Sequence, residues 1–449
     1  MRLQKLIHFG LLVAARASGA AALFGVNLLI VNYLGIEALS TYAIFVSLVS
    51  VTAVLISAGF TSVAPIFVAE YAKMGQPELH KGFTFNAFKQ GTGLLAVLGL
   101  GFVLAYLCGA LAFFEGSFVL GIAALCGAAA TAALGFNSAV LVGMKEQVAG
   151  LIPETLIRPL IFLSLATVFL SAGIAVSIKE ILWLLVGSIW ITLGFAILRN
   201  RKYQQKLPEV QRKFDKPRWR RAAFPWMGIT LLWDFLIDII LLFMSIMAGS
   251  IEIAILHICF RYRVLAGFGM RTIHTLLMPE ITEETVIGNK EGLQKKLRQV
   301  NLASLAYSSI TLFIFTVFGS MLLGLFSSQA STSVALLLVV SMTMVIRAVF
   351  GPAPLVLAIH NFHIMTLKVS AVSVIAAVVF ILMTYNSIGI MAAAIGYTGA
   401  NMIVSSFLWY YAKRKTGIDC SLFSLISSKS TQSRTGDKKQ PAPEVMQTQ

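Results

Sequence analysis

Charged residues are scarce in this sequence. Only 12% of its 449 residues are Asp, Glu, Lys or Arg, whereas a soluble globular domain carries roughly 25%. Hydrophobic residues make up 58% of the chain, and long apolar runs recur from near Leu6 to Tyr411. Each run has the roughly 20 residues that a helix needs to cross a bilayer. The composition therefore excludes a water-soluble fold and predicts a membrane protein.

Motifs for metals, disulfides and nucleotides are also missing. The four cysteines stand alone at Cys108, Cys126, Cys259 and Cys420, without the paired spacing of a zinc site or a disulfide framework. No Gly-Lys-Ser/Thr phosphate loop occurs, so ATP is not expected to be the direct energy source. We predict no cofactor and no metal. The stretches of about ten residues with alternating polarity that mark a membrane β-barrel are absent as well.

The apolar runs predict an all-α membrane protein with about twelve transmembrane helices. Breaks at Gly, Pro and charge clusters delimit them. The expected helices cover 7–32, 38–66, 86–112, 118–143, 151–171, 176–198, 223–247, 251–278, 301–326, 332–358, 365–384 and 389–412.

The basic residues, which give a net charge of +16, follow the membrane topology. They do not form a patch interleaved with aromatic residues, so nucleic acid is not an expected partner. Alternate connections hold almost all of them, and the opposite connections contain only Lys179. Because positive charge marks the cytoplasmic side, both termini are predicted to be cytoplasmic.

A basic segment divides the chain into two halves. Residues 199–221 contain ten Lys or Arg against Glu209 and Asp215. We expect a six-helix lobe at 1–198, a basic cytoplasmic linker at 199–222, a second six-helix lobe at 223–412 and a disordered cytoplasmic tail at 413–449. Weak likenesses at an offset of 213 to 214, such as Gly35 with Gly249, predict that the lobes are parallel repeats about a pseudo-two-fold axis along the membrane normal.

One stretch carries a family resemblance. Residues 33–83 read YLGIEALSTYAIFVSLVSVTAVLISAGFTSVAPIFVAEYAKMGQPELHKGF, with Leu34-Gly35, Tyr42-Ala43 and Gly59-Phe60 as the main features. This stretch resembles the polysaccharide transporter branch of the multidrug/oligosaccharidyl-lipid/polysaccharide exporter superfamily. The resemblance implies two lobes around a central cavity that opens alternately to each side. It also implies a flippase for an undecaprenyl-pyrophosphate-linked oligosaccharide, with cavity cations that match the pyrophosphate.

Ionisable residues at bilayer depth are costly, so each is a candidate functional residue. Most of those present are arginines, and guanidinium groups bind phosphate oxygens bidentately. Asn27 is included because it shares a helical face with Arg16. The predicted substrate ligands are Arg16, Arg263, Arg271, Arg158, Arg261, Asn27 and His274.

The spacing leaves several alternatives open for these residues. Arg263, Gly267 and His274 share one helical face and Arg261 points nearly opposite, so one of the two arginines is expected to face another helix. Arg158 follows Glu154 by four residues and could form a local ion pair. Arg347 is expected to snorkel to the membrane interface.

Two aspartates have opposite charge to the arginines. Asp234 and Asp238 lie four residues apart on one expected helical face, together with Thr230. Asp238 and Arg261 are at equal distance from a turn near Gly249, which places them at similar depth. The aspartates are therefore predicted to form either a structural charge pair with arginine or a site that couples a proton or sodium ion.

Two prolines predict a kink in a later helix. Pro352 and Pro354 both fall within the helix expected at 332–358.

The excess of intramembrane arginine favours an anionic substrate, and we expect a transporter, not an enzyme. A cation-coupled multidrug antiporter of the same superfamily is the alternative that Asp234 and Asp238 keep open. A polytopic glycan polymerase or ligase is the alternative from another class, although the far-side connections are short and no Asp-Asp pair occurs. The expected setting is the bacterial inner membrane, with polysaccharide polymerase or assembly proteins as further partners.

The topology is testable by labelling single cysteines in intact cells. A cysteine at position 205, in the basic segment, should resist a membrane-impermeant maleimide because the segment is predicted to be cytoplasmic. A cysteine at position 386, in an opposite connection, should react and serves as the control. Strong labelling at 205 in folded protein would reverse the orientation.

Overall fold

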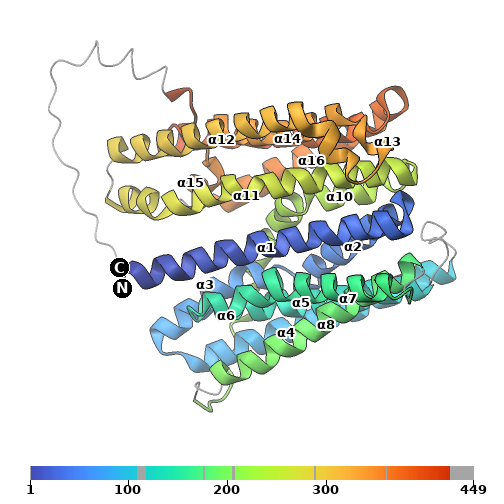
Figure 1. The fold of residues 1–449 in the computed structure, drawn as a ribbon. Helices are drawn as coiled ribbons and strands as arrows, with labels where there is room; N and C mark the ends of the chain where they lie inside the picture. The colour runs from blue at the N-terminus through green and yellow to red at the C-terminus, as the bar shows by residue number, and fades with distance from the viewer. Residues whose placement is uncertain are drawn as a thin grey trace, which may run out of the picture.

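The structure, a computed structural model, is a bundle of long helices that run side by side (Figure 1). It describes residues 2–108, 118–174, 177–204, 208–287, 290–359 and 362–424, and these ranges contain no β-strand. A helix satisfies its backbone N–H and C=O groups internally, which hydrocarbon requires of any chain that crosses it.

The first half of the chain forms helices that match the expected spans in order. They are α1 (Arg2–Leu34), α2 (Ile36–Ser57), α3 (Phe60–Met74), α4 (Pro77–Leu107), α5 (Phe118–Gly143), α6 (Gln147–Ile152), the π-helix η2 (Pro153–Ile157), α7 (Arg158–Ser171) and α8 (Ile178–Gln204). Residues 109–112 of the helix expected at 86–112 lie outside the described residues.

The second half continues the same pattern. Its elements are α9 (Lys216–Ile229), the π-helix η3 (Thr230–Asp234), α10 (Leu236–Met244), α11 (Ser250–Ile287), α12 (Lys290–Gly324), α13 (Ser328–Ser331), α14 (Val334–Phe350), α15 (Ala353–Ile359), α16 (His363–Ile388) and α17 (Met391–Thr416).

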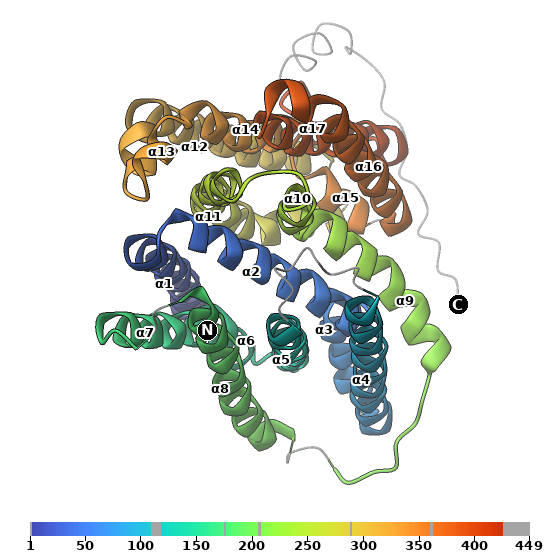
Figure 2. The same cartoon turned by 90° about the vertical axis from the view of Figure 1, so that its right-hand side faces the viewer.

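The predicted fold class is confirmed. The described residues contain ten helices long and apolar enough to cross a membrane, or eleven if the bent pair 216–234 and 236–244 is one span. The shorter apolar helix α14 takes the place of the remaining expected span. Figure 2 shows two lobes, with α1–α8 on one side and α10–α17 on the other. Helix α2 of the first lobe packs against α10 and α11 of the second.

Two expected helices are interrupted at a glycine. The helix expected at 38–66 ends at Ser57, because Ala58 and Gly59 adopt positive φ angles of 47° and 78°, and α3 then continues to Met74. The helix expected at 332–358 breaks at Gly351, next to Pro352, so the predicted kink is confirmed as a full interruption. Gly351 has φ of 72°, and a Cβ there would lie 1.9 Å from the carbonyl oxygen of Cys420, so only glycine fits.

The segment expected to link the two lobes, 199–222, is partly helical. Helix α8 extends to Gln204 and α9 begins at Lys216, so the non-helical described part is 208–215. The beginning of α9 is docked on the first lobe, where the indole Nε1 of Trp219 donates to the hydroxyl of Tyr71 at 2.6 Å. The guanidinium of Arg218 forms an ion pair with Glu70 at 2.8 Å.

The expectation of a wholly disordered tail is wrong for its first part. Residues 413–416 belong to α17, and residues 417–424 fold back on the second lobe. Asn301 donates its amide to the carbonyl of Cys420 at 2.5 Å, and Leu422 N–H donates to the carbonyl of Val349 at 2.9 Å. The polar composition predicts that ordering this segment costs more conformational entropy than its contacts return. These buried contacts offset that cost for residues 417–424. Residues 425–449 lie outside the described residues.

Asp419 anchors this returning segment. Its carboxylate forms an ion pair with Lys413 at 2.8 Å and accepts hydrogen bonds from Trp409 Nε1 at 2.8 Å and the hydroxyl of Ser421 at 2.6 Å. Burial by itself raises the pKa of Asp419, but these partners outweigh burial and hold the pKa below its ordinary value.

Asp419→Ala should therefore destabilise the protein by about 1–3 kcal/mol, because two donors and an ammonium group lose their acceptor. The melting temperature in detergent measures this, with exposed Glu209→Ala as the control. Since the folded pKa is depressed, the contribution of Asp419 is present above the ordinary Asp pKa of about 3.9 and is lost as pH falls through the folded value. An unchanged melting temperature in Asp419→Ala would contradict this anchoring role.

Candidate functional site: an arginine-lined cavity between the lobes

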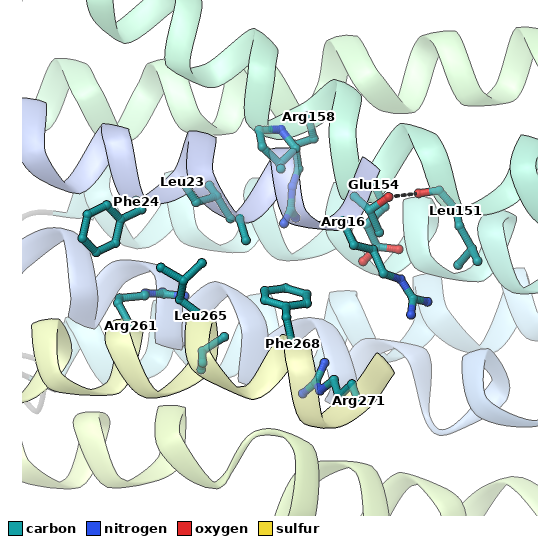
Figure 3. A pocket seen from close by; sticks show the side chains of 15 residues that line it. Arg16, Leu23, Phe24, Leu151, Glu154, Arg158, Arg261, Leu265, Phe268 and Arg271 are labelled. Carbon is teal, nitrogen blue, oxygen red and sulfur yellow. Dashed lines mark hydrogen bonds between the residues drawn. The ribbon is translucent and has the colours of Figure 1, made fainter. Parts of the chain in front are cut away.

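A cavity of about 430 Å³ lies between α1, η2 and α7 on one side and α11 on the other (Figure 3). Four arginines and a single acid line it: Arg16, Arg158, Arg261, Arg271 and Glu154. The rest of its wall is mainly apolar, with Leu23, Phe24, Leu265 and Phe268 among the lining side chains. The cavity therefore combines concentrated positive charge with apolar surface.

A second, deeper cavity of about 230 Å³ adjoins the first. Arg158, Arg261, Leu23 and Pro159 line both cavities, so the two are adjacent. The deeper cavity adds neutral polar groups and one acid, namely Asn27, Tyr42, Ser50, Thr131 and Asp238. Polar side chains thus line both cavities, with Arg16 and Arg271 in the first and Asp238 in the second.

The cavity is set in place on its α1 side by close helix packing. A Cβ on Gly19 would lie 1.7 Å from the carbonyl oxygen of Thr155, so α1 touches η2 at a glycine. The π-helix η2 inserts an extra residue into the turn that precedes Arg158. That insertion changes the spacing of Glu154 and Arg158, and the described side chains show no ion pair between the two. Both instead line the cavity.

One face of α11 supplies the opposite wall. Arg261, Leu265 and Phe268 recur every three or four residues and all line the cavity, with Arg271 one turn further on (Figure 3). Arg16 and Asn27, which are predicted to share an inward face, line the first and the second cavity respectively.

Arg263 is the arginine of α11 that faces other helices, which confirms that Arg261 and Arg263 point apart. It is only 8% exposed, donates from Nε to the hydroxyl of Thr343 at 3.2 Å and lies 5.7 Å from the Tyr397 ring. It lines neither cavity in this conformation. Sequence spacing predicts that the two arginines point apart, but it does not predict which of them faces inward.

His274 and Arg347 are also held within the second lobe. His274 Nε2 is 3.3 Å from the hydroxyl of Ser304. Arg347 donates from Nε and Nη2 to Asn401 at 3.2 and 2.9 Å and lies 4.8 Å from the Trp233 ring. Arg347 is expected to snorkel to the membrane interface, and in the structure its guanidinium is bonded to a neighbouring amide and lies against an aromatic face within the lobe.

The two aspartates do not share a helical face. The segments 216–234 and 236–244 meet at 64°, and η3 precedes the bend, so the expected i, i+4 geometry is lost. Thr230 contacts Ser62 at 3.0 Å, Asp234 is exposed, and Asp238 faces the deeper cavity. Residues 230–236 contain no proline or glycine. The π-helix and the bend therefore could not be predicted from the sequence.

Asp238 and Arg261, which are predicted to lie at similar depth, both line the deeper cavity. Yet within the part of the chain that the structure describes, no ion pair joins them. Asp238 accepts a hydrogen bond from Ser47 of the first lobe at 2.8 Å. Arg261 donates from Nε to His257 Nε2 at 3.2 Å.

Contacts between the lobes close the end of the molecule opposite the N-terminus, called the far end below. Phe24 of α1 packs edge-on against Tyr262 and Phe326, with ring centroids 5.1 and 5.2 Å apart. His257 Nε2 is 3.3 Å from the Asn27 side-chain oxygen. Figure 1 shows that α1 begins and α11 ends at the same end of the molecule, called the near end below. Along these two helices, Arg16 and Arg271 of the first cavity are closer to the near end than Asn27 and His257 are.

Ser47 and His257 were missed by sequence reasoning. A lone serine in an apolar helix carries no signal, because serine is common between membrane helices. His257 did carry one: it precedes Arg261 by four residues and so shares its helical face.

No protein-family model and no curated protein matches the chain. Several solved structures, however, have a similar fold. An inward-facing multidrug resistance MATE family transporter of the MOP superfamily aligns with a TM-score of 0.68 at 13% identity, covering 91% of this chain and 98% of its own. A MATE in its straight conformation gives 0.61 at 14% identity, covering 91% and 96%. The fold is that of the MATE transporters.

A third neighbour has the same fold. It is a MOP superfamily transporter from Pyrococcus furiosus, with a TM-score of 0.59 at 14% identity over 90% of this chain and 94% of its own. At such identities the MATE fold is shared while the lining of the cavity is free to differ, so function has to be argued from the site.

Arg261 and Arg263 should behave differently when truncated. Arg261→Ala removes a cation from the cavity and should reduce substrate binding at near-normal abundance. Arg263→Ala leaves Thr343 and Tyr397 facing a void and should lower the melting temperature, as buried large-to-small changes do. Purified yield, melting temperature and ligand binding of both variants measure the difference. Equal stability losses would contradict the assignment of Arg261 to the cavity and Arg263 to the lobe interior.

Proposed function

We propose that this chain is a transporter that moves an anionic lipid-linked oligosaccharide, with an undecaprenyl-pyrophosphate carrier, across the bacterial inner membrane by alternating access. The observation that carries the proposal is the lining of the cavity by four arginines and one glutamate. A pyrophosphate supplies compact negative charge that several guanidinium groups can bind bidentately. The apolar wall suits the lipid that bears it.

The arrangement of the lobes supports transport. The cavity lies between two lobes, on the near-end side of the contacts that Phe24 and Asn27 make with the second lobe. A site between two lobes that are joined on one side of it suits alternating access. With the predicted topology, the near end is cytoplasmic, where lipid-linked sugars are assembled before export to polymerase and assembly proteins.

A cation-coupled multidrug antiporter is the second candidate, and the solved neighbours favour it because one is a multidrug resistance MATE family transporter and others are MATE proteins. The charge of the cavity favours the anion instead, since a cavity for organic cations is expected to carry an excess of acids. Among the neighbours, the Pyrococcus furiosus protein is described as having a binding pocket of reverse polarity that suggests a different function. Pocket polarity is thus the property that separates the two candidates on this fold.

Binding to purified protein in nanodiscs tests the proposal. Undecaprenyl pyrophosphate should bind with an affinity that falls with salt, and Arg16→Gln or Arg271→Gln should each weaken binding about tenfold, as expected for loss of a charged hydrogen bond. Arg220→Gln, on the exposed face of α9, is the control and should bind as wild type. The antiporter would be favoured by a different result. In that case wild-type protein binds ethidium tightly and does not bind undecaprenyl pyrophosphate, and the two arginine variants bind ethidium more tightly still.

A further inference from the structure

The segment that joins the two lobes is docked on the first turns of α4. The backbone N–H of Lys213 donates to the carbonyl of Glu78 at 3.1 Å. A Cβ on Gly82 would lie 1.7 Å from the carbonyl oxygen of Lys213, so the two backbones touch at a glycine. Residues 211–221 are therefore held at a defined place on the first lobe, although most of their side chains are exposed.

This place lies at the boundary of the hydrocarbon. Helix α4 is a candidate membrane span, and none of its most apolar window is buried inside the molecule, so α4 faces lipid. Lys89 is the last charged residue of α4. Residues 90–107 would extend about 27 Å at 1.5 Å per residue, which is close to the thickness of the hydrocarbon. Phe85, which precedes Lys89 by one turn, therefore lies at the level of the lipid headgroups.

Two cations lie on a pair of aromatic rings at that level. The guanidinium of Arg212 is 4.1 Å from the centre of the Phe85 ring, and the ammonium of Lys216 is 5.4 Å from the centre of the Phe214 ring. The two rings contact each other, with centroids 6.4 Å apart. All four side chains are exposed, and together they are called the interfacial cluster below. The ring faces favour these positions of the two cations.

The cations of the interfacial cluster have no ion-pair partner in the part of the chain that the structure describes. Residues 211–221 contain six Lys or Arg and one acid, Asp215. The carboxylate of Asp215 accepts from the backbone N–H of Arg218 at 3.4 Å and so caps α9. Arg218 is itself paired with Glu70 at 2.8 Å. The cluster therefore combines an excess of positive charge with exposed aromatic surface.

We infer that the interfacial cluster binds the headgroup of an anionic phospholipid such as phosphatidylglycerol. A phosphodiester has two oxygens that share one negative charge, and the guanidinium of Arg212 can donate to both. Lys216 supplies a second cation, and the exposed rings suit the region between headgroups and acyl chains, where aromatic residues are enriched. Basic segments at a membrane surface attract anionic lipid in general. Docking on α4 turns this attraction into a site with fixed donors.

The headgroup site is separate from the arginine-lined cavity and does not rest on the proposed function. It lies where the chain passes from one lobe to the other. From there α9 runs to the second lobe, where a Cβ on Gly228 would lie 2.5 Å from Leu367 of α16. A lipid that binds only the folded protein stabilises it by mass action, so phosphatidylglycerol should raise the melting temperature in detergent.

Binding of fluorescent phosphatidylglycerol to the purified full chain in non-ionic detergent tests the site. Wild-type protein should bind it more tightly than phosphatidylcholine, and added salt should weaken binding. The Arg212→Gln, Lys216→Gln double variant should bind about tenfold more weakly, because two charged hydrogen bonds are lost. Arg201→Gln, Lys202→Gln removes the same charge from the exposed end of α8 and should bind as wild type. Equal weakening in both double variants, or none in the first, overturns the inference.

A further variant separates the geometry of the cluster from its net charge. Phe85→Leu keeps an apolar side chain and every charge but removes the ring on which Arg212 lies. Binding of phosphatidylglycerol should weaken about two- to fivefold, and the melting temperature without lipid should stay as in wild type because Phe85 is exposed. Wild-type affinity in Phe85→Leu would contradict a site built on the rings.

Two other anions share the phosphate chemistry and serve as competitors. Inorganic phosphate that displaces phosphatidylglycerol at an equal concentration would show a site for a free anion and overturn the inference. Undecaprenyl pyrophosphate should bind the Arg212→Gln, Lys216→Gln variant as tightly as wild type, and its loss there would assign the cluster to the transported lipid instead. Absence of undecaprenyl pyrophosphate binding to wild type, with phosphatidylglycerol binding intact, would refute the proposed function and leave the headgroup site supported.

Discussion

The structure depends on the cost of placing guanidinium groups at bilayer depth. A charged side chain in hydrocarbon is accommodated only with water, an anion or polar partners. Arg16, Arg158, Arg261 and Arg271 meet this requirement by lining a cavity between the lobes. Arg263 and Arg347 meet it inside the second lobe, through Thr343, Asn401 and aromatic faces. The same residue type thus builds both the cavity and the interior of the lobe that faces it.

The closed far end combines apolar and polar contacts. The rings of Phe24, Tyr262 and Phe326 exclude water, while Ser47 with Asp238 and Asn27 with His257 link the lobes by hydrogen bonds. Hydrogen bonds between membrane helices contribute modestly, on the order of 0.6–2 kcal/mol each. Contacts of that size hold the lobes together and can still be exchanged during transport, which a tight apolar core would resist.

Hydropathy predicted the number, order and approximate limits of the helices, because the bilayer imposes one length on every span. It could not predict the break at Ala58, the π-helices or the bend after Asp234, since these depend on packing between helices far apart in sequence. For the site, helical periodicity predicted that Arg16 faces inward and that Arg261 and Arg263 diverge. Which of the two faces the cavity was decided by α14 and α17, whose positions no local pattern contains. The order of residues 417–424 could not be predicted for the same reason, because Asp419 and Cys420 contact residues of α12, α14 and α17 that no local pattern places beside them.

We propose that the arginine-lined cavity carries a lipid-linked anion from one side of the membrane to the other. Proteoliposomes that contain a fluorescent undecaprenyl-pyrophosphate oligosaccharide measure this directly, with an impermeant quencher reporting how much glycan reaches the outside. Wild-type protein should increase the quenched fraction over time, and the Arg16→Gln, Arg271→Gln double variant, reconstituted in equal amount, should not. Equal translocation by the double variant, or translocation no faster than in protein-free liposomes, would contradict the account.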